Sequence, residues 1–336
     1  MSNFLKETFI ADRILSDEQK NQLKGFREIQ CNHPGFTYLT GVTEKDTIPN
    51  HTWKWTGQAT EPQRGYTSIQ IENGSETKTI DSYCKVTHRL DPIRWTRGKY
   101  TMPSQLTKKK QKHFVNEATK LSDAMNQAYI ENVVYTMVSY LREQDISPHF
   151  PFYYGSFTAI ADKYQFNITE DYDSFKNMKW FWNGLDKEKF ALKVFSFHDE
   201  TDSEQKEWTR RPSVLEDDLS DLDSDEDGAS MKSADDLSFH SAKTDESQSD
   251  EEHGSYHEPH FYMELPQFPV LLMYLEKSDG VMDDLVEDYE QVPAQVGSPE
   301  WEVIWSAWLF QIISALSVLQ HTISLTHNDL HTNNIV

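Results

Sequence analysis

The sequence predicts an α+β fold, in which an antiparallel sheet packs with one long helix and the start of a helical part follows. Runs rich in β-forming residues occupy 66–72 and 79–86, and Asn73-Gly74 between them is a typical hairpin turn. Residues 113–143 repeat apolar side chains at helical spacing. Ser298 followed by Pro299 is a typical N-cap and first turn of another helix.

The remaining elements follow in chain order. Residues 1–50 carry apolar side chains near helical spacing and predict a helical N-terminal extension. After the helix, prolines precede a predicted strand over 152–157, and the apolar run 268–274 predicts another. A short acidic helix is expected over 282–289. The predicted divisions are 1–50, 51–157, an insertion over 158–265, and 266–336.

Charge is concentrated in one segment. The 336-residue chain has a formal net charge of −23, of which 199–256 carries −15 through 20 acidic and 5 basic residues. Strong self-repulsion and few apolar groups predict that this tract is disordered. Nucleic acid is excluded as the main partner, because phosphate backbones require a cationic surface. Two cysteines and no secretory signal favour the cytoplasm, the host cytoplasm if the protein is viral.

The acidic tract has three readings. Its serines lie beside acidic residues and suit acidophilic kinases, so that phosphorylation would extend the tract further. It also offers a surface for basic partners, or it is a solvated linker with no specific role. The serines in question are Ser220, Ser224, Ser230 and Ser238.

One apolar stretch, 303–319, is uncharged and about as long as the shortest membrane spans. It contains Gln311 and three serines, and Glu300 and Glu302 precede it. We expect a helix buried in a water-soluble protein, and membrane association is not expected.

Chemistry is carried by the segment from His327 to Asn334. Phosphoryl transfer needs a carboxylate to orient the attacking hydroxyl and an oxygen ligand for Mg²⁺ on the same loop. The pattern His-x-Asp-Leu-x-x-x-Asn supplies both, through Asp329 and Asn334, with His327 supporting the loop. The alternative is a His- and Asn-rich loop that caps a helix without catalysis.

Together with the helix 307–316 before it, this loop resembles the catalytic loop of the eukaryotic-type protein kinase superfamily. This variant of the loop resembles serine/threonine kinases of giant nucleocytoplasmic DNA viruses. The resemblance covers about residues 60–157 and 266–336. It implies a kinase-like fold with an antiparallel-sheet N-lobe, the start of a helical C-lobe, and ATP and Mg²⁺ as cofactors.

The resemblance also implies an ion pair that holds the ATP phosphates, between a strand lysine and a helix glutamate. Lys85 and Glu131 are assigned to it, and each has the alternative of being an ordinary surface residue. Lys78 is the other candidate for the lysine. Glu117 and Glu143 are the other candidates for the glutamate.

The strand and hinge that would hold adenine resemble 270–275. Leu272 would lie at the back of the pocket, and Met273, Tyr274 and Leu275 would form the hinge. A plain core strand predicts the same apolar pattern.

Three departures from the family are visible. No Gly-x-Gly-x-x-Gly occurs, and Gly57 and Gly65 are the glycines of the corresponding region. His331 stands where many protein kinases have lysine and where choline- and aminoglycoside-kinase-type enzymes often have histidine. The Asp-Phe-Gly that binds Mg²⁺ is absent. We therefore expect these 336 residues to be part of a longer protein and to transfer little phosphate by themselves.

The leading hypothesis is an ATP-dependent protein kinase acting on Ser or Thr of a protein substrate. Two alternatives stay open: a small-molecule kinase, indicated by His331, and a non-catalytic pseudokinase scaffold, indicated by the imperfect glycine loop and the absent Asp-Phe-Gly.

Overall fold

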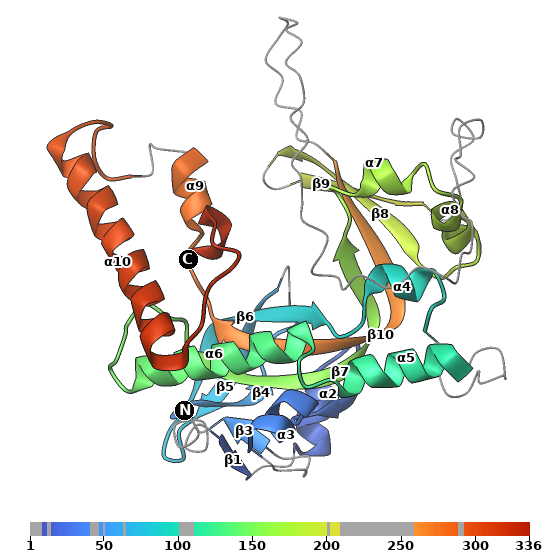
Figure 1. Ribbon diagram of the computed structural model, residues 1–336, viewed down its shortest axis with the longest axis horizontal. Helices are drawn as coiled ribbons and strands as arrows, with labels where there is room; N and C mark the ends of the chain where they lie inside the picture. The colour runs from blue at the N-terminus through green and yellow to red at the C-terminus, as the bar shows by residue number, and fades with distance from the viewer. Residues whose placement is uncertain are drawn as a thin grey trace, which may run out of the picture. The chain divides into compact units, whose positions relative to one another are not determined.

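The computed structural model describes residues 9–11, 15–40, 47–49, 51–62, 65–100, 111–199, 202–208, 259–287 and 292–336 (Figure 1). The chain divides into two compact units. The first comprises Met1–Trp95, Lys99–Asp162 and Gln267–Val336, and the second Thr96–Gly98 and Lys163–Pro266. The insertion predicted over 158–265 is close to the main segment of the second unit.

The first unit is built on a sheet whose strands lie in the order β2-β7-β10-β6-β5-β4, and each of its registered pairs is antiparallel. The expected α+β class is therefore confirmed. Strands β7 and β10 run on into the second unit. The strands are β2 (Phe26–Gln30), β4 (Lys54–Gln58), β5 (Tyr66–Glu72), β6 (Thr77–His88), β7 (Tyr153–Asn167) and β10 (His260–Glu276).

The predicted hairpin is present as β5 and β6, with Tyr66 opposite Tyr83 and Glu72 opposite Thr77. Its turn depends on Asn73, whose side-chain oxygen accepts hydrogen bonds from the backbone N–H groups of Ser75 and Glu76. Gly74 adopts φ +87°, a conformation that favours glycine.

The single helix predicted over 113–143 is wrong in one respect, because it is two helices, α5 (Gln111–Ser122) and α6 (Gln127–Glu143). Asp123 accepts from the N–H of Met125 at 2.9 Å and starts a turn. Asn126 then caps α6 by accepting from Ala128, and its amide donates to the carbonyls of Arg89 and Lys120. A polar pair interrupts the helix although the apolar spacing continues across it.

The N-terminal extension is not simply helical. Helix α2 (Asp17–Gln22) begins with a capping box between Ser16 and Gln19, but the chain turns at Gly25, which has φ +78°. Strand β2 follows and pairs with β7, so the helical spacing of Leu23 and Phe26 did not indicate a continuous helix. The other elements here are α3 (Pro34–Thr40) and the paired strands β1 (Phe9–Ala11) and β3 (Thr47–Pro49).

Helix α2 contacts strand β4, which lies at the opposite end of the strand order from β2. The Gln19 amide donates to the carbonyl of Thr56 at 2.7 Å, and Gln22 accepts from the N–H of Gln58 at 2.9 Å. Both hydrogen bonds satisfy backbone groups of β4, which is the last strand in the order of the described strands. The segment 16–30 thus reaches both ends of the sheet order, through α2 at β4 and through β2 at β7.

Helix α6 packs on one face of the sheet. Its buried Ala128 and Tyr129 contact Leu271 and Met273 of β10. The later part of α6 forms a second cluster with the end of helix α10 (Pro299–Ile323) (Figure 1). That cluster comprises Val138, Leu141, Phe150, Leu319 and Ile323.

Helix α10 begins as predicted, with the Ser298 hydroxyl accepting from the N–H of Trp301 and Pro299 in the first turn. The expectation that it is buried is wrong for most of its length. Its buried residues are Leu319 and Ile323, at its end. Phe310 is 70% exposed and Ile313 64%. By length and composition alone α10 could cross a membrane, which is weak evidence for a single helix.

The second unit has an aromatic core. The buried rings of Phe181, Trp182 and Phe190 pack together, and Tyr172 stacks on Phe261 with 3.7 Å between ring centroids. Its elements are α7 (Tyr172–Phe175), α8 (Lys179–Asp186), β8 (Ala191–Asp199) and β9 (Asp202–Trp208), with β8 between β9 and the start of β10. Helix α4 (Pro92–Thr96) lies at the boundary between the units.

The start of the acidic tract differs from the prediction. Residues 202–208 form β9, because they pair in register with β8 from Leu192 to Asp199. The disorder predicted from about 199 is therefore wrong for this strand. Residues 209–256, with the four serines, lie outside the described residues.

Candidate functional site

The structure brings Lys85 and Glu131 together. Lys85 of β6 and Glu131 of α6 form an ion pair, and the hydroxyl of Thr87 donates to the second oxygen of Glu131 at 3.2 Å. Two of the other candidates have different partners: Lys78 lies over the ring of Trp53, and Glu143 accepts from the N–H of Thr52. Glu117, the remaining candidate, is buried in α5.

Strand alternation explains where Lys85 points. Ser82 and Cys84 are buried on one face of β6, so Lys85 projects from the opposite face. Met273 lies directly opposite Lys85 in the register with β10, and it packs against Ala128 of α6. The same helix therefore covers Met273 and delivers Glu131 to the lysine.

The pair is partly accessible to solvent. The Lys85 side chain is 38% exposed and that of Glu131 25%, so an incoming ligand can reach the ammonium group. Burial opposes the charged form of Lys85, but the negative groups around it outweigh burial and raise its pKa. The negative groups include the carboxylate of Glu131 and, at high pH where its hydroxyl is ionised, Tyr135, which lies one turn after Glu131.

Met273 and Leu275 lie inside β10 rather than in a connection, which begins only after Glu276. Both side chains are buried. The carbonyl of Leu275 accepts from the hydroxyl of Ser82 at 2.7 Å, and the N–H of Glu276 donates to Phe152 at 2.8 Å. These backbone groups already have partners in the sheet, so they are less available to a nucleobase than hinge groups would be.

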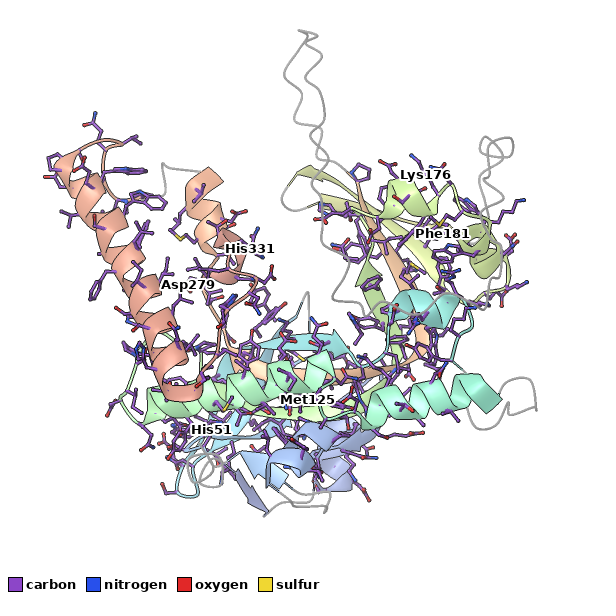
Figure 2. The ribbon with its side chains drawn as sticks, viewed as in Figure 1. His51, Met125, Lys176, Phe181, Asp279 and His331 are labelled. Carbon is purple, nitrogen blue, oxygen red and sulfur yellow. The ribbon has the colours of Figure 1, made fainter. Side chains whose placement is uncertain are left out.

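The loop 325–331 follows the end of α10, where Ser324 adopts φ +55°. The 3-10 helix η5 (Thr332–Asn334) follows, and its turn places Asn334 next to Asp329. The amide of Asn334 donates to the carbonyl of Asp329 at 2.8 Å, approaches its carboxylate at 3.3 Å, and bonds Nε2 of His331 at 2.9 Å. Asp329, His331 and Asn334 thus form one compact group (Figure 2 labels His331).

His327 is exposed and makes no hydrogen bond or ion pair within the described part of the chain. Asp329 and Asn334 are exposed as well, and the Asp329 side chain is 85% exposed. A carboxylate and an amide oxygen are suitable Mg²⁺ ligands, and the amide N–H bonds of Asn334 leave its oxygen for that purpose. Among the described residues no group of three or more His, Cys, Asp or Glu side chains is placed to hold a metal.

Helix α9 (Met282–Glu287) contacts this loop. The carboxylate of Asp283 accepts from the hydroxyl of Thr332 and, at 3.0 Å, from the amide of Asn333. The N–H of Met282 donates to the carbonyl of Ile335 at 2.8 Å. Sequence reasoning missed Asp283, because an acidic residue in a first helical turn is explained by the helix dipole alone.

The two glycines have structural roles. Gly65 has φ +86°, and a Cβ at this position would lie 2.5 Å from the Tyr83 ring. At Gly57 a Cβ would lie 2.7 Å from the side-chain oxygen of Gln22. Both positions are packed by neighbouring side chains, so the described residues of this hairpin give no support to a phosphate-binding glycine loop.

One helix connects the two groups of candidate residues. The first half of α6 carries Glu131, and its second half packs on the end of α10, from which the loop of Asp329 leaves. No protein family, curated protein or solved structure matches the chain.

Proposed function

We propose that this chain belongs to an ATP-dependent phosphotransferase, in the first instance a protein kinase acting on Ser or Thr. The single observation that carries the proposal is the ion pair between Lys85 of a central strand and Glu131 of the helix on that strand. A strand lysine held by a helix glutamate is the arrangement that positions ATP phosphates in kinases. The sequence pattern around Asp329 supports the same chemistry.

Each residue has a defined role in this proposal. Lys85 binds the α- and β-phosphates while Glu131 fixes its ammonium group. Asp329 orients the acceptor hydroxyl and accepts its proton, and Asn334 offers its amide oxygen to Mg²⁺. Mg·ATP, when bound, supplies the phosphoryl group and the charge neutralisation. No contact role is assigned to His327, and Met273 and Leu275 are buried residues of β10, the strand that pairs with the strand of Lys85.

Calorimetric titration with Mg·ATP tests the phosphate site. Lys85→Met should weaken binding by about tenfold or more, because a charge-assisted bond to phosphate is lost. Lys78→Met is the matched control: Lys78 is on the same strand and lies 3.7 Å from the Trp53 ring centroid. Equal affinities for the wild type and Lys85→Met would contradict the proposal.

Transfer is measured on the full gene product with radiolabelled ATP. Asp329→Asn should abolish transfer and leave Mg·ATP binding unchanged, because the residue acts on the acceptor. Unchanged transfer by Asp329→Asn would exclude the assigned mechanism.

A small-molecule kinase is the second candidate. The observation in its favour is His331, whose ring bonds Asn334 and presents no lysine ammonium to a peptide acceptor. Peptide arrays and a panel of small alcohols separate the two candidates. Labelling of a small alcohol without any peptide labelling would replace the protein-kinase proposal.

A further inference from the structure

Helix α9 meets the loop of Asp329 through three hydrogen bonds. Two end on the carboxylate of Asp283, from Thr332 and from Asn333, so each oxygen of that carboxylate has its own donor. The third joins the N–H of Met282 to the carbonyl of Ile335. These contacts bracket Asn334, with two residues bound before it and one after it.

The contacts on both sides of Asn334 restrict the orientation of its side chain. Thr332, Asn333 and Asn334 form the single turn of η5, and the amide of Asn334 in turn contacts Asp329. A short 3-10 turn has few hydrogen bonds of its own, so outside contacts decide whether it keeps its geometry. Asp283 supplies two of them at once.

We propose that Asp283 is a positioning residue for phosphoryl transfer, which holds η5 so that Asn334 and Asp329 keep their mutual orientation. The inference rests on the proposed function and adds to it a residue outside the loop. Because Asp283 touches neither of those two side chains in the structure, it acts through Thr332 and Asn333.

Neighbouring acidic residues do not share this arrangement. Asp284 accepts from the N–H of Val281 at 3.0 Å, within its own segment. Asp279 is exposed and makes no hydrogen bond or ion pair with other described residues (labelled in Figure 2). Asp279→Asn therefore removes the same charge nearby and leaves the bonds to η5 intact.

Hydrogen exchange of the 336-residue chain tests whether Asp283 holds η5, and it does not require enzyme activity. Asp283→Ala should accelerate exchange of the amides of Asn334 and Ile335 by about tenfold or more, because their turn opens more often. Asp279→Asn should leave them unchanged. Unchanged exchange in Asp283→Ala overturns the inference, whatever the enzyme does.

Kinetics of the full gene product test the positioning role. Asp283→Ala should lower kcat by about ten- to a hundredfold and change the KM for ATP less than about twofold, because displaced groups slow the chemical step. Thr332→Val should lower kcat in the same direction, and combining it with Asp283→Ala should add little, since both remove one interaction.

The outcomes separate the two proposals. Faster exchange with a lower kcat supports the positioning role. Faster exchange with an unchanged kcat overturns it and leaves the phosphotransferase proposal standing. If the wild type transfers no phosphate to any acceptor, the phosphotransferase proposal fails. The positioning role of Asp283 in catalysis then fails with it, even if hydrogen exchange shows that Asp283 holds η5.

Discussion

Arg142, near the end of α6, forms an ion pair with Glu276, the last residue of β10. The guanidinium also donates to the carbonyl of Phe150 at 2.7 Å and lies 3.9 Å from the ring centroid of Phe152. The same carboxylate accepts from the N–H of Phe152 at 3.3 Å. This group ties the helix that carries Glu131 to the strand that leads toward α9.

Replacing this arginine should destabilise the first unit. Arg142→Ala should lower the free energy of unfolding in urea by about 2–3 kcal/mol, because several charge-assisted bonds are lost and Glu276 keeps no cation. The free energy of unfolding of Arg142→Lys should lie between those of the wild type and Arg142→Ala, since lysine cannot reproduce the planar fork of donors.

The matched control is Arg27, which pairs with Asp162 at 3.1 Å with both side chains half exposed. Arg27→Ala should change the free energy of unfolding by at most about 1 kcal/mol, as exposed ion pairs do. Equal decreases in the free energy of unfolding for Arg142→Ala and Arg27→Ala would show that Arg142 stabilises the fold no more than an exposed ion pair does.

Local signals predict the parts of this fold that depend on neighbours in the sequence. The turn at Asn73-Gly74 and the cap at Ser298 need only adjacent residues, and both are present as expected. Strand β2 could not be predicted, because its partner β7 lies far along the chain and its register is broken by a bulge between Arg27 and Gln30.

Glu143 gives the first unit a specific acid dependence. Burial works against its charged form, but the nearby His51 ring, 3.7 Å away, and the N–H of Thr52 at 3.0 Å outweigh burial and lower its pKa. A carboxyl with a lowered pKa in the folded state stabilises the fold above its unfolded pKa, and this contribution disappears as the pH falls through the folded value.

Glu143→Gln should therefore be less stable than the wild type at pH 7, and the difference should shrink as the pH is lowered below about 4.5. Urea unfolding at a series of pH values measures it. Glu170, which is exposed, is the control: Glu170→Gln should change the free energy of unfolding at pH 7 by at most about 0.5 kcal/mol. A Glu143→Gln difference that stays constant down to pH 3 would rule out this linkage.

The candidate site could be predicted only where a sequence pattern defines it. The resemblance to protein kinases assigns Lys85 and Glu131 to one ion pair, and their side chains form it. Asp283 and its partner Thr332 are 49 residues apart, and nothing in either local sequence indicates the contact. Met273 and Leu275, which the resemblance assigns to a hinge, lie inside β10, because an apolar run gives no sign of where a strand ends.

The last prediction concerns helix α10, which has two different environments along its length. Leu319 is 6% exposed and packs with Leu141 of α6, whereas Phe310 is 70% exposed. Leu319→Ala should lower the free energy of unfolding by about 2–4 kcal/mol, because it leaves a cavity in that cluster. Phe310→Ser should change it by less than about 0.5 kcal/mol, since no buried contact is lost.

The comparison of these two variants has a direct reading. Both remove a large apolar side chain from one helix, and neither lowers intrinsic helix propensity much, because alanine is a better helix former than leucine and serine ranks close to phenylalanine. A large loss of stability in Phe310→Ser, measured by urea unfolding of the full gene product, would mean that other polypeptide or lipid covers this part of α10. A loss confined to Leu319→Ala would mean that the end of α10 alone belongs to the core of the first unit.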